Sequence, residues 1–218
     1  MGLTGGIASG KSTITRLLAS MGCLTVDADS IVAELYQPGR AGHRALVANY
    51  GPSILRPDQT IDRALLADLA FASESSAGQL NALIHPLVRQ EQDRLSAAEA
   101  ARHPDRDRIF VVEATLLIEA GNIDRYDCIV VVDLDPEMQL ERAEARGMSR
   151  AEAARRMSHQ MAREKRLLHA DYILDNSSDV AATERQTRRL YEFLQHDLDE
   201  KKHGRALQKK TPRRIGGA

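Results

Sequence analysis

The residues best suited to chemistry lie next to the amino terminus, in the stretch LTGGIASGKST at residues 3–13. Its spacing matches G-x-x-x-x-G-K-[ST], formed here by Gly5, Gly10, Lys11 and Ser12. In that pattern backbone N–H groups surround the phosphates of a nucleotide, and glycine is required because a side chain would hold the backbone away from the anion. We expect Lys11 to contact the β and γ phosphates and the Ser12 hydroxyl to bind Mg²⁺ between them. The stretch therefore predicts a phosphate-binding loop.

The segments on either side of this loop predict a strand before it and a helix after it. Apolar residues recur at helical spacing in Ile14, Leu17, Leu18 and Met21. The loop would thus deliver the phosphates to a helix N-terminus, where the macrodipole attracts anions. Only residues 1–4 precede Gly5, which is less than a usual strand length. We therefore expect either that the given start is late and truncates this strand, or that the first strand is short.

Two carboxylates follow the next apolar segment. Asp27 and Asp29 come after Leu24 and Val26, where a helical pattern begins. That position is the carboxyl end of a strand, beside the crevice where open α/β sheets bind ligands. Alternatively, Asp29 or Ser30 caps the following helix. The two acids one strand away from a phosphate loop favour a role in chemistry.

Three later segments predict further strands. Residues 109–112 and 128–132 are nearly continuous apolar runs, as expected of parallel strands buried on both faces. They are followed by Glu113 and Asp133, either of which could be the second acidic motif of a nucleotide-binding site. A last strand is expected at 171–176, followed by a final helix.

Between the second and third strands the pattern is helical from about residue 39 to 105. Pro86 lacks a backbone donor, so we expect a helix to break at His85 and a new one to begin there. His85 itself is interpreted as a capping or packed histidine, with a functional role as the alternative. This block predicts an all-helical insertion.

The most charged region follows the fourth strand and predicts a cationic lid. Asp135 and Pro136 are a strong helix start, and Ser149 with Glu152 fits a capping box. Runs of charge usually form solvated faces. At this position, however, small phosphotransferases carry a lid, and the candidates for reaching the phosphates are Arg142 and Arg146, with Gly147 ending their helix.

Composition narrows the class of protein. Thirty Lys and Arg against 31 Asp and Glu give a formal charge of −1, which does not favour nucleic acid or an anionic membrane. The two cysteines, Cys23 and Cys128, lie beside apolar runs and are expected to be buried thiols. No apolar stretch reaches 18 residues and no leader precedes the loop, so we expect a soluble, cytoplasmic protein. The basic carboxyl end, residues 196–218, is expected to be a mobile tail.

Taken together, these stretches resemble the dephospho-coenzyme A kinases. The match extends to about residue 195 and includes, in order, LTGGIASGKST, VDAD, QPG, YG, IDRALLADLAF, IHPLV, LLIEAG, DPEMQLERAEARG and ADYILDN. The helical insertion with its IHP sequence separates this family from adenylate kinases and GTPases. The resemblance implies an α/β fold of the P-loop nucleotidase type, in three layers, with a five-stranded parallel sheet, an all-helical acceptor-binding insertion and a small helical lid. The implied divisions are a core (1–38, 106–140, 169–195), the insertion (39–105), the lid (141–168) and the tail (196–218).

The resemblance also implies transfer of the γ-phosphoryl group of ATP, with Mg²⁺, to the 3′-hydroxyl of dephospho-coenzyme A. The catalytic residues it implies are Lys11, Asp29 and Arg142. The implied ATP-binding residues are Gly6, Ala8, Ser9, Gly10, Lys11, Ser12, Thr13, Arg146 and Asn176, with Ser12 at the metal. The implied acceptor-binding residues are Thr4, Asp27, Asp29, Phe71, His85, Pro86 and Glu113. No nucleic-acid or membrane partner is expected, and the chain is expected to be a monomer or a weak homo-oligomer.

Two positions depart from the family pattern. Ala8 stands where glycine is usual and would be strained by about 1 kcal/mol or more if the position needs positive φ. Thr115 stands directly before LLIE, at a position where the family commonly has a proline.

Two other functions would use the same phosphate-binding loop. The protein could be a kinase of another small acceptor, such as a nucleoside monophosphate, or a non-enzymatic nucleotide-dependent binding module that uses the basic tail.

Overall fold

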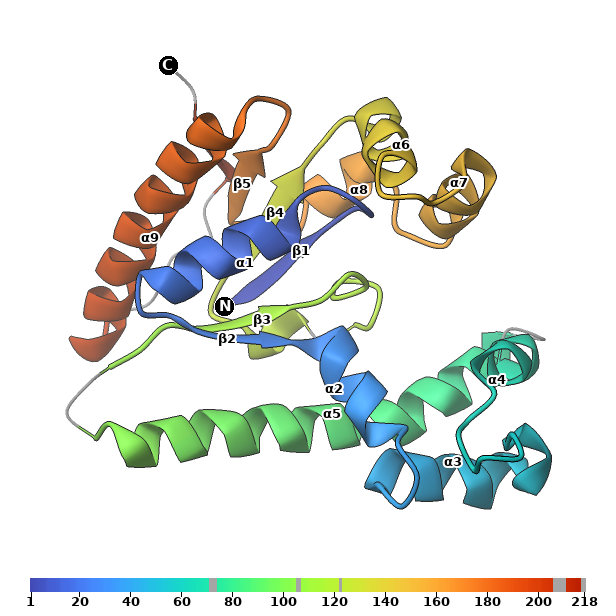
Figure 1. The fold of residues 1–218 in the computed structure, drawn as a ribbon. Helices are drawn as coiled ribbons and strands as arrows, with labels where there is room; N and C mark the ends of the chain where they lie inside the picture. The colour runs from blue at the N-terminus through green and yellow to red at the C-terminus, as the bar shows by residue number, and fades with distance from the viewer. Residues whose placement is uncertain (71–73, 105–106, 122, 206–210, 217–218) are drawn as a thin grey trace. The chain divides into compact units, whose positions relative to one another are not determined.

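The computed structural model describes residues 1–70, 74–104, 107–121, 123–205 and 211–216. The chain divides into two compact units: Met1–Val26 with Asp107–Ala218, and Asp27–Arg106. We call the first the α/β unit and the second the helical unit. Figure 1 traces the helices and strands of each unit, and each unit has a hydrophobic core of its own.

The α/β unit is built on a sheet with the strand order β2-β3-β1-β4-β5-β6. β1 pairs in parallel with β3 and β4, and β5 pairs in parallel with β4 and β6. Its strands are β1 (Gly2–Gly5), β2 (Leu24–Asp27, whose last residue is assigned to the helical unit), β3 (Phe110–Glu113), β4 (Ile129–Asp133), β5 (Tyr172–Asp175) and β6 (Arg213–Ile215). Its helices are α1 (Lys11–Ser20), η2 (Ile123–Arg125), α6 (Pro136–Glu144), α7 (Arg150–Ser158), α8 (Arg163–Leu167) and α9 (Val180–Lys202).

The α/β class and the parallel sheet are confirmed, but the expected number of five strands is wrong. The sixth strand, β6, lies within residues 196–218, the segment predicted to be a mobile tail, and α9 continues into the same segment as far as Lys202. Ile215 pairs with Leu174 and is almost fully buried. The strand was missed because it is three residues long and two of them are arginines, which leaves no recognisable apolar pattern.

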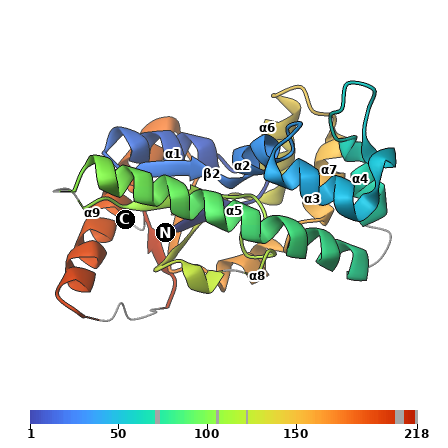
Figure 2. The same cartoon turned by 90° about the horizontal axis from the view of Figure 1, so that it is seen from below.

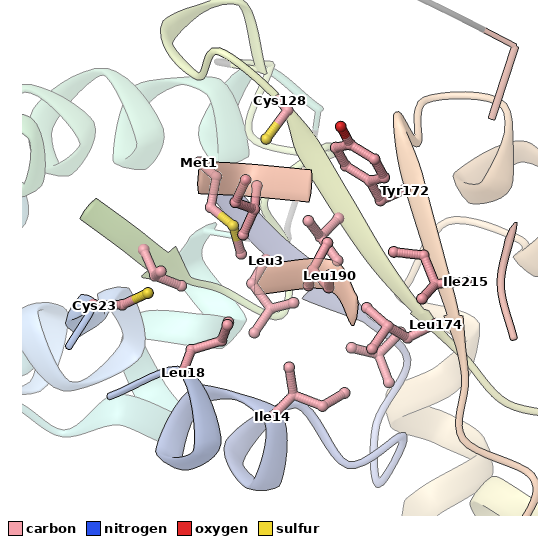
Figure 3. Packing of buried hydrophobic residues seen from close by; sticks show 14 residues of the cluster. Met1, Leu3, Ile14, Leu18, Cys23, Cys128, Tyr172, Leu174, Leu190 and Ile215 are labelled. Carbon is pink, nitrogen blue, oxygen red and sulfur yellow. The ribbon is translucent and has the colours of Figure 1, made fainter. Parts of the chain in front are cut away.

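The sheet is apolar on both faces, as a parallel sheet requires. Successive residues of β4 alternate between two cores: Val130 and Val132 face the cluster that contains α1 and α9, whereas Ile129 and Val131 face the other cluster. Figure 3 shows Ile14 and Leu18 of α1 among the strand residues of the first cluster. This packing fixes α1, and with it the loop before it, against β1 and β4.

Both cysteines pack as free, buried thiols, as expected. Burial raises the pKa of Cys23 to about 11 and that of Cys128 to about 12. The reactive thiolate is therefore scarce near neutral pH, and the two side chains act as small apolar groups.

The helical unit has its own core, formed by Leu46, Ile54, Ile61, Leu66 and Ile84. Its elements are α2 (Ala28–Leu35), α3 (Ala41–Tyr50), η1 (Pro52–Ile54), α4 (Arg63–Ala70) and α5 (Glu74–Arg102). The expected absence of sheet strands holds for the part of residues 39–105 that the structure describes, where Leu55 and Ile61 form one isolated bridge. None of the helices among the described residues is long and apolar enough to cross a membrane.

The predicted break at His85 is wrong, because α5 runs continuously through Pro86 (Figure 2). Proline removes one backbone hydrogen bond and clashes with the preceding turn, at about 3 kcal/mol in a helix interior. The neighbouring side chains offset this cost: Ile84 is buried in the core of the helical unit, and Leu80, Leu83 and Val88 pack against it. Tertiary packing thus overrides the local preference.

Candidate phosphate-binding site and lid

The loop between β1 and α1 has the backbone shape that binds phosphate. Ala8 and Gly10 both have positive φ, 55° and 98°, and the Ser9 N–H donates to the Gly6 carbonyl at 3.2 Å. Positive φ values of this kind turn successive N–H groups toward one concave side, which forms an anion site. The condition stated for Ala8 is therefore met: its φ is positive, so this residue is strained.

The glycines of the loop are needed because other groups lie against them. A Cβ on Gly5 would lie 2.6 Å from the Val132 carbonyl oxygen. A Cβ on Gly6 would overlap the side-chain oxygen of Gln139, and one on Gly10 would overlap the amide nitrogen of Asn176. The bare backbone is therefore required for packing of the loop as well as for close approach of a phosphate.

Lys11 and Ser12 stand at the start of α1, where the first N–H groups lack partners within the helix. The Lys11 side chain is buried and its Nζ donates to the carbonyl oxygens of Gly5 at 3.1 Å and Gly6 at 3.3 Å. Ser12 is exposed. The loop thus combines amides, a cation and an accessible hydroxyl, a donor set that suits a magnesium-bound triphosphate.

Asn176, in the turn after β5, connects the loop to the lid. Its Nδ2 donates to the Ser9 carbonyl at 2.7 Å, and its Oδ1 accepts from the Thr183 hydroxyl at 2.5 Å. Its backbone oxygen accepts from Arg142 Nη2 at 2.8 Å. The structure therefore brings Arg142 and Asn176 together beside Ser9 and Gly10, and it uses the Asn176 amide to hold the loop.

The two helix starts predicted around the lid segment are confirmed. Asp135 caps α6 by accepting from the Glu137 N–H, Pro136 occupies the first turn, and Ser149 caps α7 by accepting from the Glu152 N–H. Arg146 lies beyond the last residue of α6 and is exposed. Its predicted contact with phosphate stays a prediction.

Glu113 and Asp133, the two candidates for the second acidic motif, have different partners. Glu113 accepts from the Thr15 hydroxyl at 2.6 Å. Asp133 accepts from Arg163 Nε and Nη2 at 2.7 and 3.0 Å, and Arg214 lies 3.4 Å away. Burial alone would raise the Asp133 pKa, but the hydrogen bonds and charge of Arg163, with the charge of Arg214, outweigh it and hold the pKa below its ordinary value. Because arginines already satisfy Asp133, Glu113 is the better candidate for the second acidic motif.

Thr4 lies directly before the phosphate-binding loop and is fully buried in β1. Its hydroxyl donates to the carbonyl oxygen of Thr115 at 3.4 Å, which joins β1 to the segment after β3. Thr4 thus has a packing role, and its acceptor-binding role stays a prediction.

The remaining predicted acceptor residues belong to the helical unit. Asp27 caps α2: it accepts from the Asp29 N–H at 3.0 Å and from the Ser30 hydroxyl at 2.5 Å. The alternative that Asp29 or Ser30 is the cap is therefore wrong. Asp29 is exposed in the first turn of α2.

His85 lies in α5, where burial, and then the charge of Arg89, lower its pKa. Phe71 lies outside the described residues.

Two glutamines and one arginine at this site could not be found from the sequence. Gln139 lies against Gly6, Gln160 accepts from the Ile7 N–H, and Arg163 pairs with Asp133. Each is far along the chain from its partner. Arg163 stands in a run of arginines that carries no signal for one member over another. Gln139 lies within the stretch DPEMQLERAEARG, where the resemblance implies no role for it, and Gln160 lies in none of the stretches that carry the family resemblance.

Among the described residues no group of three or more His, Cys, Asp and Glu side chains is placed to hold a metal ion. Mg²⁺ commonly keeps several waters and is bound through one or two protein groups together with substrate phosphates. The exposed Ser12 hydroxyl beside the loop fits that pattern.

Comparison with known protein families gives a match over residues 1–182 to the family model described as dephospho-CoA kinase. The chain is 40% identical over 197 residues to a dephospho-CoA kinase of Streptomyces avermitilis, covering 90% of this chain and 94% of that protein. It is 44% identical over 193 residues to a dephospho-CoA kinase of Geobacter metallireducens, covering 88% and 94%.

Solved structures give the same fold. The crystal structure of TT1252 from Thermus thermophilus is 29% identical, with a TM-score of 0.72, covering 90% of this chain and 96% of that one. A dephospho-CoA kinase from Campylobacter jejuni is 21% identical, with a TM-score of 0.58, covering 88% and 95%.

Proposed function

The chain belongs to the dephospho-CoA kinase family, and from that premise we propose that it transfers the γ-phosphoryl group of ATP to the 3′-hydroxyl of dephospho-CoA. The products are coenzyme A and ADP. The observation that carries the proposal is the family match over residues 1–182, joined to a loop whose positive-φ backbone, buried lysine and helix N-terminus suit a triphosphate.

On the ATP side, catalysis is mainly positioning and electrostatics. The loop amides and Lys11 hold the β and γ phosphates, and Arg142 balances charge on the transferred group. Arg142 is well placed for this role because its guanidinium is held against the Asn176 carbonyl beside the loop. Magnesium, when bound through Ser12, would neutralise further charge on the same phosphates. Arg146 and the lid segment 141–168 close over them.

On the acceptor side, Asp29 orients the 3′-hydroxyl and accepts its proton late in the transfer. Asp27 supports this role, since its carboxylate holds the first turn of α2 through the Asp29 N–H and the Ser30 hydroxyl. The other residues proposed to bind the acceptor are Phe71, His85 and Pro86 of the insertion 39–105, and Thr4 and Glu113 of the α/β unit. The enzyme works in the cytoplasm as a monomer or weak homo-oligomer without a nucleic-acid or membrane partner.

The direct test follows ATP-dependent conversion of dephospho-CoA to coenzyme A by mass, with AMP and CMP as competing acceptors. Wild-type protein should phosphorylate dephospho-CoA alone. Asp29→Asn should retain MgATP binding and lose about 10²-fold or more in turnover, because it removes the proton acceptor. Phosphorylation of AMP or CMP instead, or near-full turnover by Asp29→Asn, would contradict the proposal.

The lid assignment needs a matched pair of variants. An arginine that stabilises a transferring phosphoryl group is worth on the order of 10³-fold in related reactions, so Arg142→Ala should reduce kcat strongly. Arg155, an exposed arginine of α7, serves as the control, and Arg155→Ala should change kcat less than about twofold. Equal, mild losses of kcat in both variants would contradict the proposed role of Arg142.

A further inference from the structure

The phosphate loop is tied to the far end of the lid by a single side chain. The N–H of Ile7, the residue before strained Ala8, donates to Oε1 of Gln160 at 3.1 Å. Gln160 lies between the end of α7 at Ser158 and the start of α8 at Arg163. We call residues 160–162 the joint.

The joint is itself held by other segments of the α/β unit. The N–H of Met161 donates to Oε1 of Glu119 at 2.7 Å, and Nη2 of Arg166 donates to the Met161 carbonyl at 2.6 Å. Arg166 is buried, and its neighbour Arg163 pairs with Asp133 at the end of β4. Both the N–H and the carbonyl of Met161 are therefore hydrogen-bonded, so the backbone that carries the Gln160 side chain is held in place.

The helix that leads into the lid, α6, touches the same turn of the loop. Gln139, in the first turns of α6, is buried, and its Nε2 donates to the Leu134 carbonyl at 2.8 Å. Its oxygen lies where a Cβ on Gly6 would be. The peptide between Gly6 and Ile7 thus lies against Gln139 and Gln160. Its Gly6 carbonyl accepts from the Ser9 N–H at 3.2 Å and from Lys11 Nζ at 3.3 Å, and its Ile7 N–H donates to Gln160.

We propose that Gln160 is a positioning residue for ATP: its amide oxygen holds the Ile7 N–H, and so keeps the first turn of the phosphate loop in the shape that receives the phosphates. The inference rests on the proposed function only in that the loop binds ATP. Without this bond the peptide is held at its Gly6 carbonyl but no longer by Gln160 at its Ile7 N–H. The strained Ala8 can then relax toward negative φ, which would turn the loop amides away from the anion.

The test compares Gln160→Leu, Gln160→Glu and the control Gln195→Leu, an exposed glutamine of α9. Gln160→Leu keeps the size of the side chain but has no acceptor. It should raise the Kd for MgATP and the KM for ATP about 5- to 10-fold, as expected for one lost hydrogen bond, and leave the KM for dephospho-CoA unchanged. Gln160→Glu keeps the acceptor but adds a negative charge near the phosphates, so its loss of affinity should shrink as salt is raised.

Binding is measured by calorimetry without an acceptor, so an error in the proposed acceptor would not affect the result. Melting curves of all three variants are recorded alongside. An unchanged Kd for MgATP in Gln160→Leu would overturn the inference, even with a lower melting temperature, because the residue would then act on folding alone. Equal increases in both KM values, or a Gln160→Glu defect that is insensitive to salt, would overturn it as well.

Discussion

At Ala8 the local backbone preference conflicts with the shape that the phosphate loop requires. Its φ of 55° costs a residue with a Cβ about 1–2 kcal/mol, whereas glycine adopts this conformation without that penalty. Ala8→Gly should therefore stabilise the protein by up to about 1 kcal/mol, after the extra freedom of glycine in the unfolded chain is subtracted. Urea unfolding measures the difference.

The control is the same substitution in an exposed helix interior. Ala154 lies in α7 and is exposed, so Ala154→Gly should destabilise the protein by about 1 kcal/mol. Opposite signs for the two substitutions would confirm that the gain at position 8 comes from relief of positive φ. Destabilisation by both would show that the loop does not hold Ala8 in that conformation.

Residues of the candidate site were predictable where the chemistry is contiguous in sequence. Gly5, Gly10, Lys11 and Ser12 form a local pattern from which a phosphate-binding loop could be predicted. The partners that hold the loop come from distant segments: Asn176 is 167 residues away from Ser9, and Gln160 is 153 residues away from Ile7. No local propensity encodes such pairs.

At the scale of elements, α5 shows how packing overrides a local signal. Pro86→Ala restores a backbone donor and removes a steric clash, so the variant should be more stable by about 1–3 kcal/mol. If Pro86 also shapes the acceptor site, the KM for dephospho-CoA should rise while the KM for ATP stays constant. Thermal unfolding measures the change in stability, and steady-state kinetics measures the two KM values. A less stable variant would contradict the account of the helix.

The pairing of α8 with β4 predicts a pH-dependent contribution to stability. The Asp133 side chain is 3% exposed and accepts two hydrogen bonds from Arg163. Arg163→Met should lower the free energy of unfolding at pH 7 by about 1–3 kcal/mol, since it leaves a buried carboxylate with fewer partners. Because the folded-state pKa of Asp133 is depressed, the contribution is complete above the unfolded pKa of about 4 and is lost as pH falls through the lower folded value.

Denaturant unfolding of wild type and Arg163→Met across this pH range provides the measurement. The difference between them should be constant from pH 5 to 7 and shrink below about pH 4. The matched control is Arg150→Met, which breaks the exposed pairs with Glu137 and Glu144 and should cost less than about 1 kcal/mol. A difference that grows as pH falls would contradict the assignment.

At the scale of the whole molecule, the last strand completes the sheet from outside the region that the family model matches, which ends at residue 182. β6 covers the edge of β5, and its Ile215 is buried in the hydrophobic cluster that contains α1 and α9. In a variant that ends at Arg205, the free energy of unfolding should fall by at least the 2–4 kcal/mol expected for Ile215→Ala. The truncated protein should also associate through the exposed edge of β5, because an unpaired strand offers N–H and C=O groups to another chain. Urea unfolding with light scattering separates the two effects: Ile215→Ala retains the strand and should lose stability without associating. A truncated protein as stable and as monodisperse as wild type would show that β6 contributes nothing to the fold.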